Sequence, residues 1–439
     1  MPNRFLLTVA GLLMLLFSGS PGFHLQAQQQ KPTPSPTPGK PKPPKLTSHV
    51  VLISISGLRA DHANDPPNNS ESFGLKIPNL KSLRAKGSYA VGVESVYPSQ
   101  TIPAHVSMVT GVLPADHGVT ADFPFDEQTA TLSAMPFQSA KTIKADTIWE
   151  AAKRENLTTA AIGFPMTADA NINFNQPETS DEAKVQAAVA IIEKNSPNLL
   201  AVNFTSLDLA ERRFGLLSNE AKSAAELIDG MVGKIVAAIE RAGLGEKTTF
   251  LIVSDHGAIK VEQEFRPNVL LAKKGFLTVG EQGSIASWQA VAVSFGGSAA
   301  IFLKNPQDET TAKAVEELFK AYEKESSDSP LWRITIRREA ARLGADARAV
   351  LYLDAAPSFR ISARANGSMI SKTSDRSAYG YLPSRAEMRG AMFIAGKAIK
   401  ANQRIEYARL IDVAPTIARL LGLEMKTARG RVLSEVIAQ

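Results

Sequence analysis

Short apolar runs recur along the chain and predict buried β-strands. Each run is apolar at nearly every position and is bounded by polar or turn-forming residues. Runs of this kind are typical of strands that are covered on both faces, as in a parallel sheet. The predicted strands are HVVLIS (49–54), LTTAAIG (157–163), LLAVNF (199–204), TTFLIVS (248–254), SAAIFL (298–303), AVLYL (349–353) and AMFIAG (391–396).

The segments between these runs have the spacing of amphipathic helices. Residues 77–87 combine helical periodicity with a closing glycine, and the segment that begins at Thr101 carries Pro103 in its first turn. Residues 219–242 predict a long amphipathic helix, and residues 411–422 predict a closing helix. This alternation predicts a large α/β domain with a mostly parallel central sheet and helices on both faces.

The start of the chain predicts export. Residues 1–27 combine Arg4 with an apolar run from Phe5 to Phe17, which is typical of a secretory signal peptide cleaved after Ala27 or Ser20. A membrane anchor is the alternative, but the run is short for a bilayer span. We therefore expect a periplasmic or secreted protein with no transmembrane anchor after cleavage.

Residues 28–47 predict a proline-rich basic linker, and residues 48–439 predict the folded domain.

Composition excludes several classes of function. The net charge of +6 includes five basic and no acidic residues in 1–47, so the remainder carries about +1. With no basic stripe, we do not expect nucleic-acid binding. The chain has no cysteine, which excludes disulfides and thiolate metal sites.

Chemically active side chains follow three of the predicted strands. Ser56 follows the first, Asp208 follows 199–204, and Asp255 and His256 follow 248–254, while Thr101 opens a helix. Each alone also suits an ordinary cap or loop residue. Because the carboxyl ends of parallel strands meet at one edge, we expect these residues to lie together. Hydroxyl, carboxylate and imidazole groups in one place suit a divalent metal and phosphoryl chemistry.

Ordered sequence blocks extend this interpretation across nearly the whole domain. The blocks are VVLISISGLRADH (50–62), IPNLKSLRAKGSYA (77–90), YPSQTIPAHVSMVTGVLPADHGV (97–119), TIWEAAKRENLTTAAIGFP (147–165), LIVSDHGA (251–258), AYGYLPSRAEMRGAMFIAG (378–396) and IDVAPTIARLLG (411–422). In these blocks the chain resembles the type I phosphodiesterase/nucleotide pyrophosphatase family of the alkaline phosphatase superfamily. The resemblance implies an alkaline-phosphatase-like three-layer sandwich, two divalent metals, usually zinc, and a threonine nucleophile.

Part of the implied site is present. By this resemblance Thr101 is the nucleophile, and Asp208, Asp255 and His256 are metal ligands. The first of these aspartates belongs to one metal position, and the late Asp-His pair belongs to the other.

The rest of the implied site is altered. Ser56 stands where the family has a ligand aspartate, and Arg212 and Tyr379 stand where it has ligand histidines. Asp122 replaces a phosphate-binding asparagine. A guanidinium cannot ligate a cation, so the position of Arg212 and Tyr379 is expected to hold no metal.

Three interpretations remain open at this stage. In the first, the chain is a catalytically impaired protein or pseudoenzyme with at most one divalent ion, zinc by resemblance, or none. In the second, it is a one-metal hydrolase of phosphodiester or pyrophosphate bonds in a phosphate-containing small molecule, with Thr101 as nucleophile and Arg212 replacing the second metal. In the third, it is a structural envelope protein. The protein partner is left open by all three.

Overall fold

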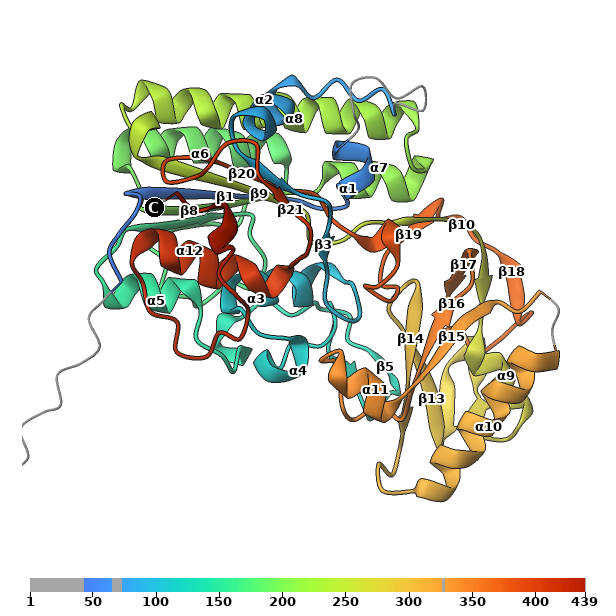
Figure 1. Cartoon of the computed structure of the whole chain (residues 1–439). Coiled ribbons are helices and arrows are strands. Elements are labelled where there is room, and N and C mark those ends of the chain that lie inside the picture. Colours follow the sequence, from blue (N-terminus) through green and yellow to red (C-terminus); the bar gives the residue numbers. More distant parts are fainter. Residues whose placement is uncertain (1–42, 65–72, 326–327, 439) are drawn as a thin grey trace, which may run out of the picture. The chain divides into compact units, whose positions relative to one another are not determined.

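A central sheet of eight strands carries the fold (Figure 1). Its strands are β1 (His49–Ile55), β2 (Ser88–Ala90), β6 (Thr159–Ile162), β7 (Phe174–Gln176), β8 (Leu199–Phe204), β9 (Thr248–Val253), β20 (Met392–Gly396) and β21 (Arg404–Ile405). Their order is β21-β2-β20-β9-β1-β8-β6-β7. Neighbours from β9 to β7 are parallel, whereas β20 runs antiparallel to both β9 and β2. The prediction of a mostly parallel sheet is confirmed.

Helices cover both faces of this sheet. One layer holds α2 (Pro78–Lys86), α6 (Asp181–Asn195) and α8 (Asn219–Arg241); the other holds α3 (Thr101–Thr110), α5 (Ile148–Arg154) and α12 (Val413–Leu421). Alternate residues of β1 serve the two cores: Val51 and Ile53 pack with the first layer, and Val50 and Leu52 with the second. The three-layer α/β sandwich is therefore confirmed.

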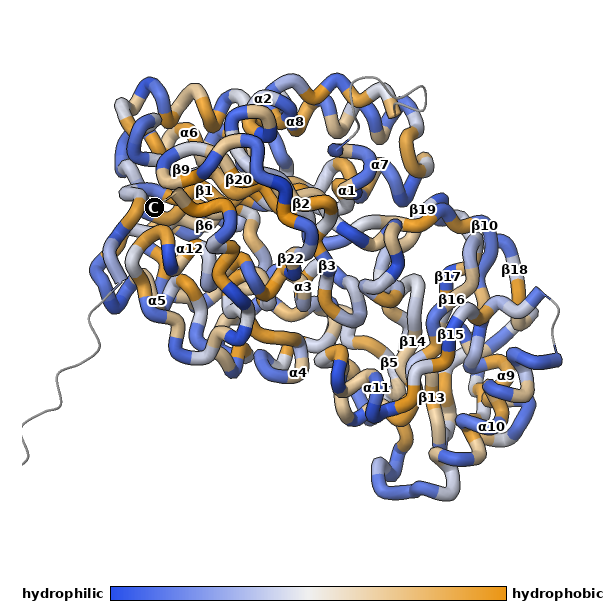
Figure 2. Tube along the Cα trace, viewed as in Figure 1, coloured by the Kyte–Doolittle hydropathy of each residue, from blue (hydrophilic) through white to orange (hydrophobic). Residues whose placement is uncertain are grey.

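Local sequence sets the ends of several of these helices. The hydroxyl oxygens of Thr147, Ser180 and Ser218 accept backbone N–H groups at the starts of α5, α6 and α8. Gly111 ends α3 in the left-handed region, with φ of 72°. Figure 2 shows hydrophobic positions concentrated along the central strands, between the two helix layers.

Residues 259–378 build separate, smaller sheets. An antiparallel sheet has the order β13-β14-β16-β15, and β10 pairs with β17, β18 and β19. The elements are β10 (Ile259–Phe265), β13 (Ala290–Ser294), β14 (Ser298–Leu303), β15 (Leu331–Ile336), β16 (Leu351–Ala355), β17 (Ser358–Ile361), β18 (Ile370–Lys372), β19 (Ser377–Ala378), α9 (Pro267–Lys273), α10 (Glu309–Glu325) and α11 (Arg337–Arg342). The predicted strands 298–303 and 349–353 thus lie outside the central sheet: β14 forms a short hairpin with β13, and β16 pairs antiparallel with both β14 and β15.

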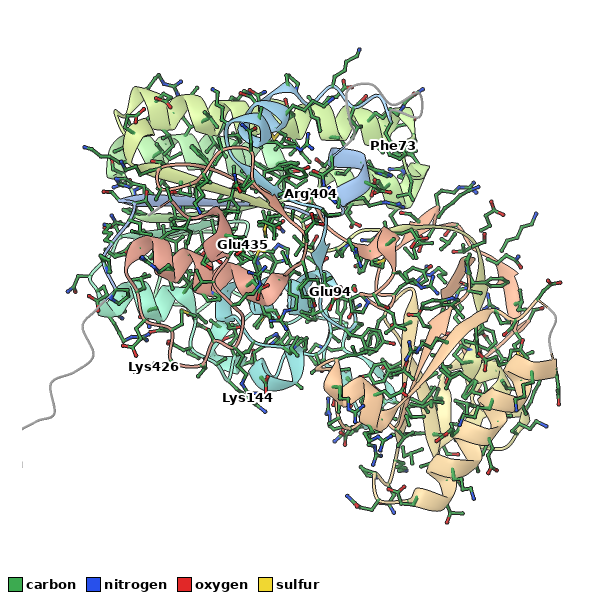
Figure 3. All side chains as sticks on the ribbon, viewed as in Figure 1. Phe73, Glu94, Lys144, Arg404, Lys426 and Glu435 are labelled. Carbon is green, nitrogen blue, oxygen red and sulfur yellow. The ribbon has the colours of Figure 1, made fainter. Side chains whose placement is uncertain are left out.

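Shorter elements complete the fold. They are α1 (Ala60–Ala63), α4 (Pro114–His117), α7 (Ser206–Phe214), and the strand pairs β3 (Val93–Glu94) with β22 (Ala408–Arg409), β4 (Phe125–Asp126) with β5 (Thr131–Leu132), and β11 (Leu277–Val279) with β12 (Ile285–Trp288). Charged side chains cover the outside, and four of the six residues labelled in Figure 3 are exposed charged residues: Lys144, Arg404, Lys426 and Glu435.

The computed structural model describes residues 43–64, 73–325 and 328–438. The predicted signal peptide and most of the predicted linker lie outside these residues and stay predictions. Across the described ranges, none of the helices combines the length and the apolar character needed to cross a lipid bilayer.

Candidate functional site

The carboxyl ends of β1, β8 and β9 meet at one edge of the central sheet. Because β1 is parallel to both neighbours, the residues that follow the three strands lie close together. Ser56 follows β1, Asp208 lies in α7 after β8, and Asp255 and His256 follow β9. The amide N–H of Gly57 donates to Oδ1 of Asp255 at 3.3 Å, which joins the first and last of these turns.

Thr101 opens α3, and its hydroxyl contacts His256. Oγ1 of Thr101 lies 3.1 Å from Nε2 of His256. The other ring nitrogen, Nδ1, lies 2.9 Å from the carbonyl oxygen of Gly257. A carbonyl oxygen can only accept, so Nδ1 carries the proton and Nε2 presents a lone pair toward Thr101. In this tautomer the imidazole suits either a metal ion or a proton from the hydroxyl.

One carboxylate oxygen of Asp255 has no hydrogen-bond partner. Oδ1 accepts two backbone N–H groups, but the buried Oδ2 accepts none within the described part of the chain. Oδ2 lies 3.3 Å from Nε2 of His256 and 3.7 Å from Nδ1 of His105. Burial lowers the pKa of His105, so that ring supplies no positive charge. A buried carboxylate oxygen without a partner is unfavourable, and a cation between Oδ2, Nε2 and the hydroxyl of Thr101 would satisfy it.

Ser56 adds little to this donor set. Its buried hydroxyl donates to Oδ1 of Asn203 at 3.2 Å. In the ranges that the structure describes, no cluster of three or more histidine, cysteine or acidic side chains has metal-binding geometry. Asp255 and His256, with the hydroxyl of Thr101, therefore fit a single weak divalent site of the kind that the resemblance implied.

The positions of the second implied metal are linked to one another instead. Nη2 of Arg212 donates to Oδ2 of Asp208 at 2.7 Å, and it lies 3.5 Å from the hydroxyl of Tyr379. The guanidinium carbon stands 5.0 Å from the centre of the Tyr379 ring, and the same ring stacks on His256 with 4.4 Å between the ring centres. The positive charge near Asp208 thus comes from Arg212, and the hydroxyl of Tyr379 extends the network toward α3.

Asp122 occupies the beginning of α3 with its own carboxyl group. Oδ1 accepts the backbone N–H of Ile102 at 2.7 Å, and Oδ2 accepts the hydroxyl of Tyr379 at 3.3 Å. Helix N-termini attract anions, so this carboxyl group takes the place that a phosphate oxygen would favour. Burial raises the pKa of Asp122 to about 6, against the opposing effect of the Ile102 hydrogen bond.

Glu211 is a buried acid that the sequence analysis missed. It lies three residues after Asp208, on the same side of α7, and its Oε2 has no hydrogen-bond partner among the described residues. A Cβ placed on Gly57, whose φ is 84°, would lie 3.2 Å from that oxygen. Burial, followed by the charge of Asp208, raises the pKa of Glu211 well above its usual value. Glu211 directly precedes Arg212 and follows Asp208 by three residues, and its proximity to these two positions was the signal that the sequence offered.

Comparisons with known proteins identify relatives of this chain. A sequence model of the type I phosphodiesterase / nucleotide pyrophosphatase family matches residues 50–376. Human ectonucleotide pyrophosphatase/phosphodiesterase family member 1 is 25% identical over 225 residues, which are 48% of this chain and 24% of that protein. Bis(5'-adenosyl)-triphosphatase ENPP4 of Pongo abelii is 26% identical over 242 residues, 51% of this chain and 49% of that protein. The chain therefore matches less than half the length of these curated relatives.

Solved structures show the same fold. Human ectonucleotide pyrophosphatase/phosphodiesterase 5 has a TM-score of 0.70 at 20% identity, covering 89% of this chain and 100% of the human one. An inactive threonine-to-alanine variant of the murine protein, solved in complex with AMP, gives the same TM-score, identity and coverage. The alkaline-phosphatase-like fold expected from the sequence is confirmed by these similarities.

Proposed function

Because this chain belongs to the type I phosphodiesterase/nucleotide pyrophosphatase family, we propose that it is an exported member in which hydrolysis is lost or strongly reduced. The observation that carries the proposal is the ion pair between Arg212 and Asp208, with an Nη2–Oδ2 distance of 2.7 Å. The pair fills a position where the resemblance implied a metal ion. Removing one of several groups that act as a unit usually removes most of the catalysis.

The network around α3 also disfavours a phosphate substrate. Above pH 6 the carboxyl group of Asp122 is negative, and it already accepts the N–H of Ile102. A phosphate group would have to displace this carboxyl group from the helix start and would meet its negative charge. The fold would then act by binding a ligand or partner, without turnover.

We place at most one divalent metal, zinc by family resemblance, at Asp255, His256 and Thr101. Such an ion would polarise a phosphoryl oxygen and lower the pKa of a bound hydroxyl. The unpartnered Oδ2 of Asp255 supports this placement, as does the lone pair that Nε2 of His256 presents. Without the carboxylate that Ser56 replaces, affinity for the ion would be reduced.

A one-metal hydrolase is the second candidate, and one observation favours it. Oγ1 of Thr101 lies 3.1 Å from a ring nitrogen able to take its proton. Arg212 keeps N–H groups with no protein acceptor in the described residues, and these could contact the oxygens of a phosphate-containing small molecule. Thr101 would attack phosphorus, and Arg212 would replace the second metal.

Metal content and hydrolysis measured on one sample separate the two candidates. The purified chain is equilibrated with zinc and dialysed, and bound metal per chain is counted. The same sample is assayed with a chromogenic phosphodiester beside a Thr101→Ala control. We expect at most one metal and no turnover above the control. Turnover that disappears in the control would establish the one-metal hydrolase and refute the proposal of lost activity.

A further inference from the structure

A cavity of about 170 Å³ opens beside Tyr379. Residues near the central sheet supply Asp122 and Arg212 to its wall, and the smaller sheets supply Arg360 and the segment that begins at Asp375. The cavity therefore joins chain segments that are far apart in sequence. Its small volume suits one ring with its substituents rather than a drug-sized molecule.

Two arginines in this wall have unused hydrogen-bond donors. Nη1 of Arg360 pairs with Oδ2 of Asp375, while its Nη2 has no protein acceptor among the described residues. Arg212 uses only Nη2, toward Asp208 and Tyr379, so its Nε and Nη1 have no protein acceptor there. Guanidinium donors that line a cavity without a protein acceptor suit the oxygens of a bound ligand.

The charges in the wall are already balanced. Arg212 is paired with Asp208, and Arg360 with Asp375, so neither guanidinium holds an excess positive charge. Asp122 adds a further acid, and both of its oxygens already accept hydrogen bonds. A ligand that brought a full negative charge would have no free cation to balance it. The unused N–H groups suit the oxygens of an uncharged molecule.

Aromatic rings supply the remaining wall. Phe123 and Tyr379 both line the cavity and are half-buried; because the Tyr379 ring already contacts His256 and Arg212, Phe123 supplies the aromatic face that a ligand can contact. A flat aromatic surface beside planar polar side chains suits a ring that has an apolar face and hydroxyl groups at its edge.

We infer that this cavity binds one unit of a neutral saccharide, with Arg212 and Arg360 donating hydrogen bonds to its ring oxygen and hydroxyl groups. The inference goes beyond the proposed loss of hydrolysis and does not depend on it. It assigns to the cavity a class of ligand that does not follow from the candidate metal-binding residues.

Saturation-transfer NMR on the purified chain tests the inference. The probes are methyl α-glucoside, methyl β-galactoside, methyl α-mannoside and N-acetylglucosamine, with sulfate as the anionic comparison. We expect at least one saccharide to bind with a Kd in the millimolar range, which corresponds to about −4 kcal/mol. Sulfate should not displace it. Binding of none of the four saccharides, or displacement by sulfate, would overturn the inference.

Paired substitutions locate the binding. Arg360→Ala combined with Asp375→Ala removes both charges together, and it should weaken binding at least tenfold. Arg241→Ala with Glu193→Ala removes an exposed ion pair on the α6–α8 surface and should leave affinity unchanged. Saccharide affinity equal to wild type in the first pair would overturn the inference.

A conservative variant separates loss of binding from loss of folding. Arg360→Lys keeps the positive charge beside Asp375 but lacks the second terminal nitrogen, Nη2, of the guanidinium. It should retain the wild-type melting temperature and still bind the saccharide several-fold more weakly. Unchanged affinity in this variant would overturn the role of the arginine donor. Metal counting and the Thr101→Ala assay are unaffected by these outcomes, so the two proposals fail separately.

Discussion

Substitution of Asp255 by asparagine should stabilise the metal-free protein. Oδ1 would keep its two backbone hydrogen bonds, from Gly57 and from the amide N–H of His256. The new amide nitrogen would replace the unpartnered Oδ2, 3.3 Å from Nε2 of His256, and its N–H could share the lone pair of that nitrogen with the hydroxyl of Thr101. Removing a buried unsatisfied group is worth about 1–3 kcal/mol.

The corresponding shift in melting temperature follows from the size of the domain. An unfolding entropy of about 2.1 cal/mol/K per residue, over roughly 400 residues, gives about 0.8 kcal/mol/K. Asp255→Asn should therefore raise Tm by about 1–4 °C in EDTA. Zinc at a hundred times its Kd should stabilise the wild type by about 2.7 kcal/mol and the variant much less.

Thermal unfolding with and without zinc measures both effects. Asp229→Asn is the matched control, because the buried carboxylate of Asp229 accepts N–H groups from Asn79 and Leu80. An amide there would face donors, so the control should lower Tm. A lower Tm for Asp255→Asn in EDTA, or an equal response of wild type and variant to zinc, would refute our account of the Oδ2 atom.

Three further predictions concern the altered positions. Asp122 has a pKa of about 6 in the folded protein, above its ordinary value, so its contribution to stability is full near pH 4 and is lost as the pH rises through 6. Denaturant unfolding should show that the unfolding free energy of the wild type falls by up to about 3 kcal/mol across that interval relative to that of Asp122→Asn. Arg212→Ala should destabilise the protein by about 1–2 kcal/mol, after allowance for the solvent exposure of Arg212. In a double-mutant cycle with Asp208→Ala, the double variant should lose less stability than the sum of the two single losses, and strictly additive losses would contradict the pairing. Burial raises the pKa of Glu211 well above its usual value, which favours the uncharged carboxyl group. Glu211→Gln should therefore change the unfolding free energy at pH 7 by less than about 1 kcal/mol, and a large loss would indicate an ionised side chain.

The central sheet was predictable because its strands are apolar at successive positions. The bounds of β8 coincide with the predicted run 199–204, and β9 ends one residue before the predicted end. Their parallel pairing with β1 places the candidate residues at one edge, as expected from parallel strands. The presence of these strands could be inferred because burial on two faces leaves a strong pattern, and the site location followed from their expected parallel pairing.

The smaller sheets and the network around α3 could not be predicted in this way. An apolar run such as 298–303 has the same pattern in either kind of sheet, and only its partner decides the direction. The hydrogen bond from Ile102 to Asp122 depends on how the chain folds back after α3. Arg360 carried no signal, because its place beside Arg212 arises only from tertiary structure.

The chain passes between the central sheet and the smaller sheets through two segments, and both carry site residues. Asp255 and His256 lie between β9 and β10, while Tyr379 lies between β19 and β20. Any hinge rotation of the smaller sheets would change the 4.4 Å stack of Tyr379 on His256. The ring current of Tyr379 shifts the proton resonances of the His256 imidazole, so these resonances would report that rotation. A ligand that contacts both the central sheet and the smaller sheets would restrict the rotation and narrow the range of those resonance positions.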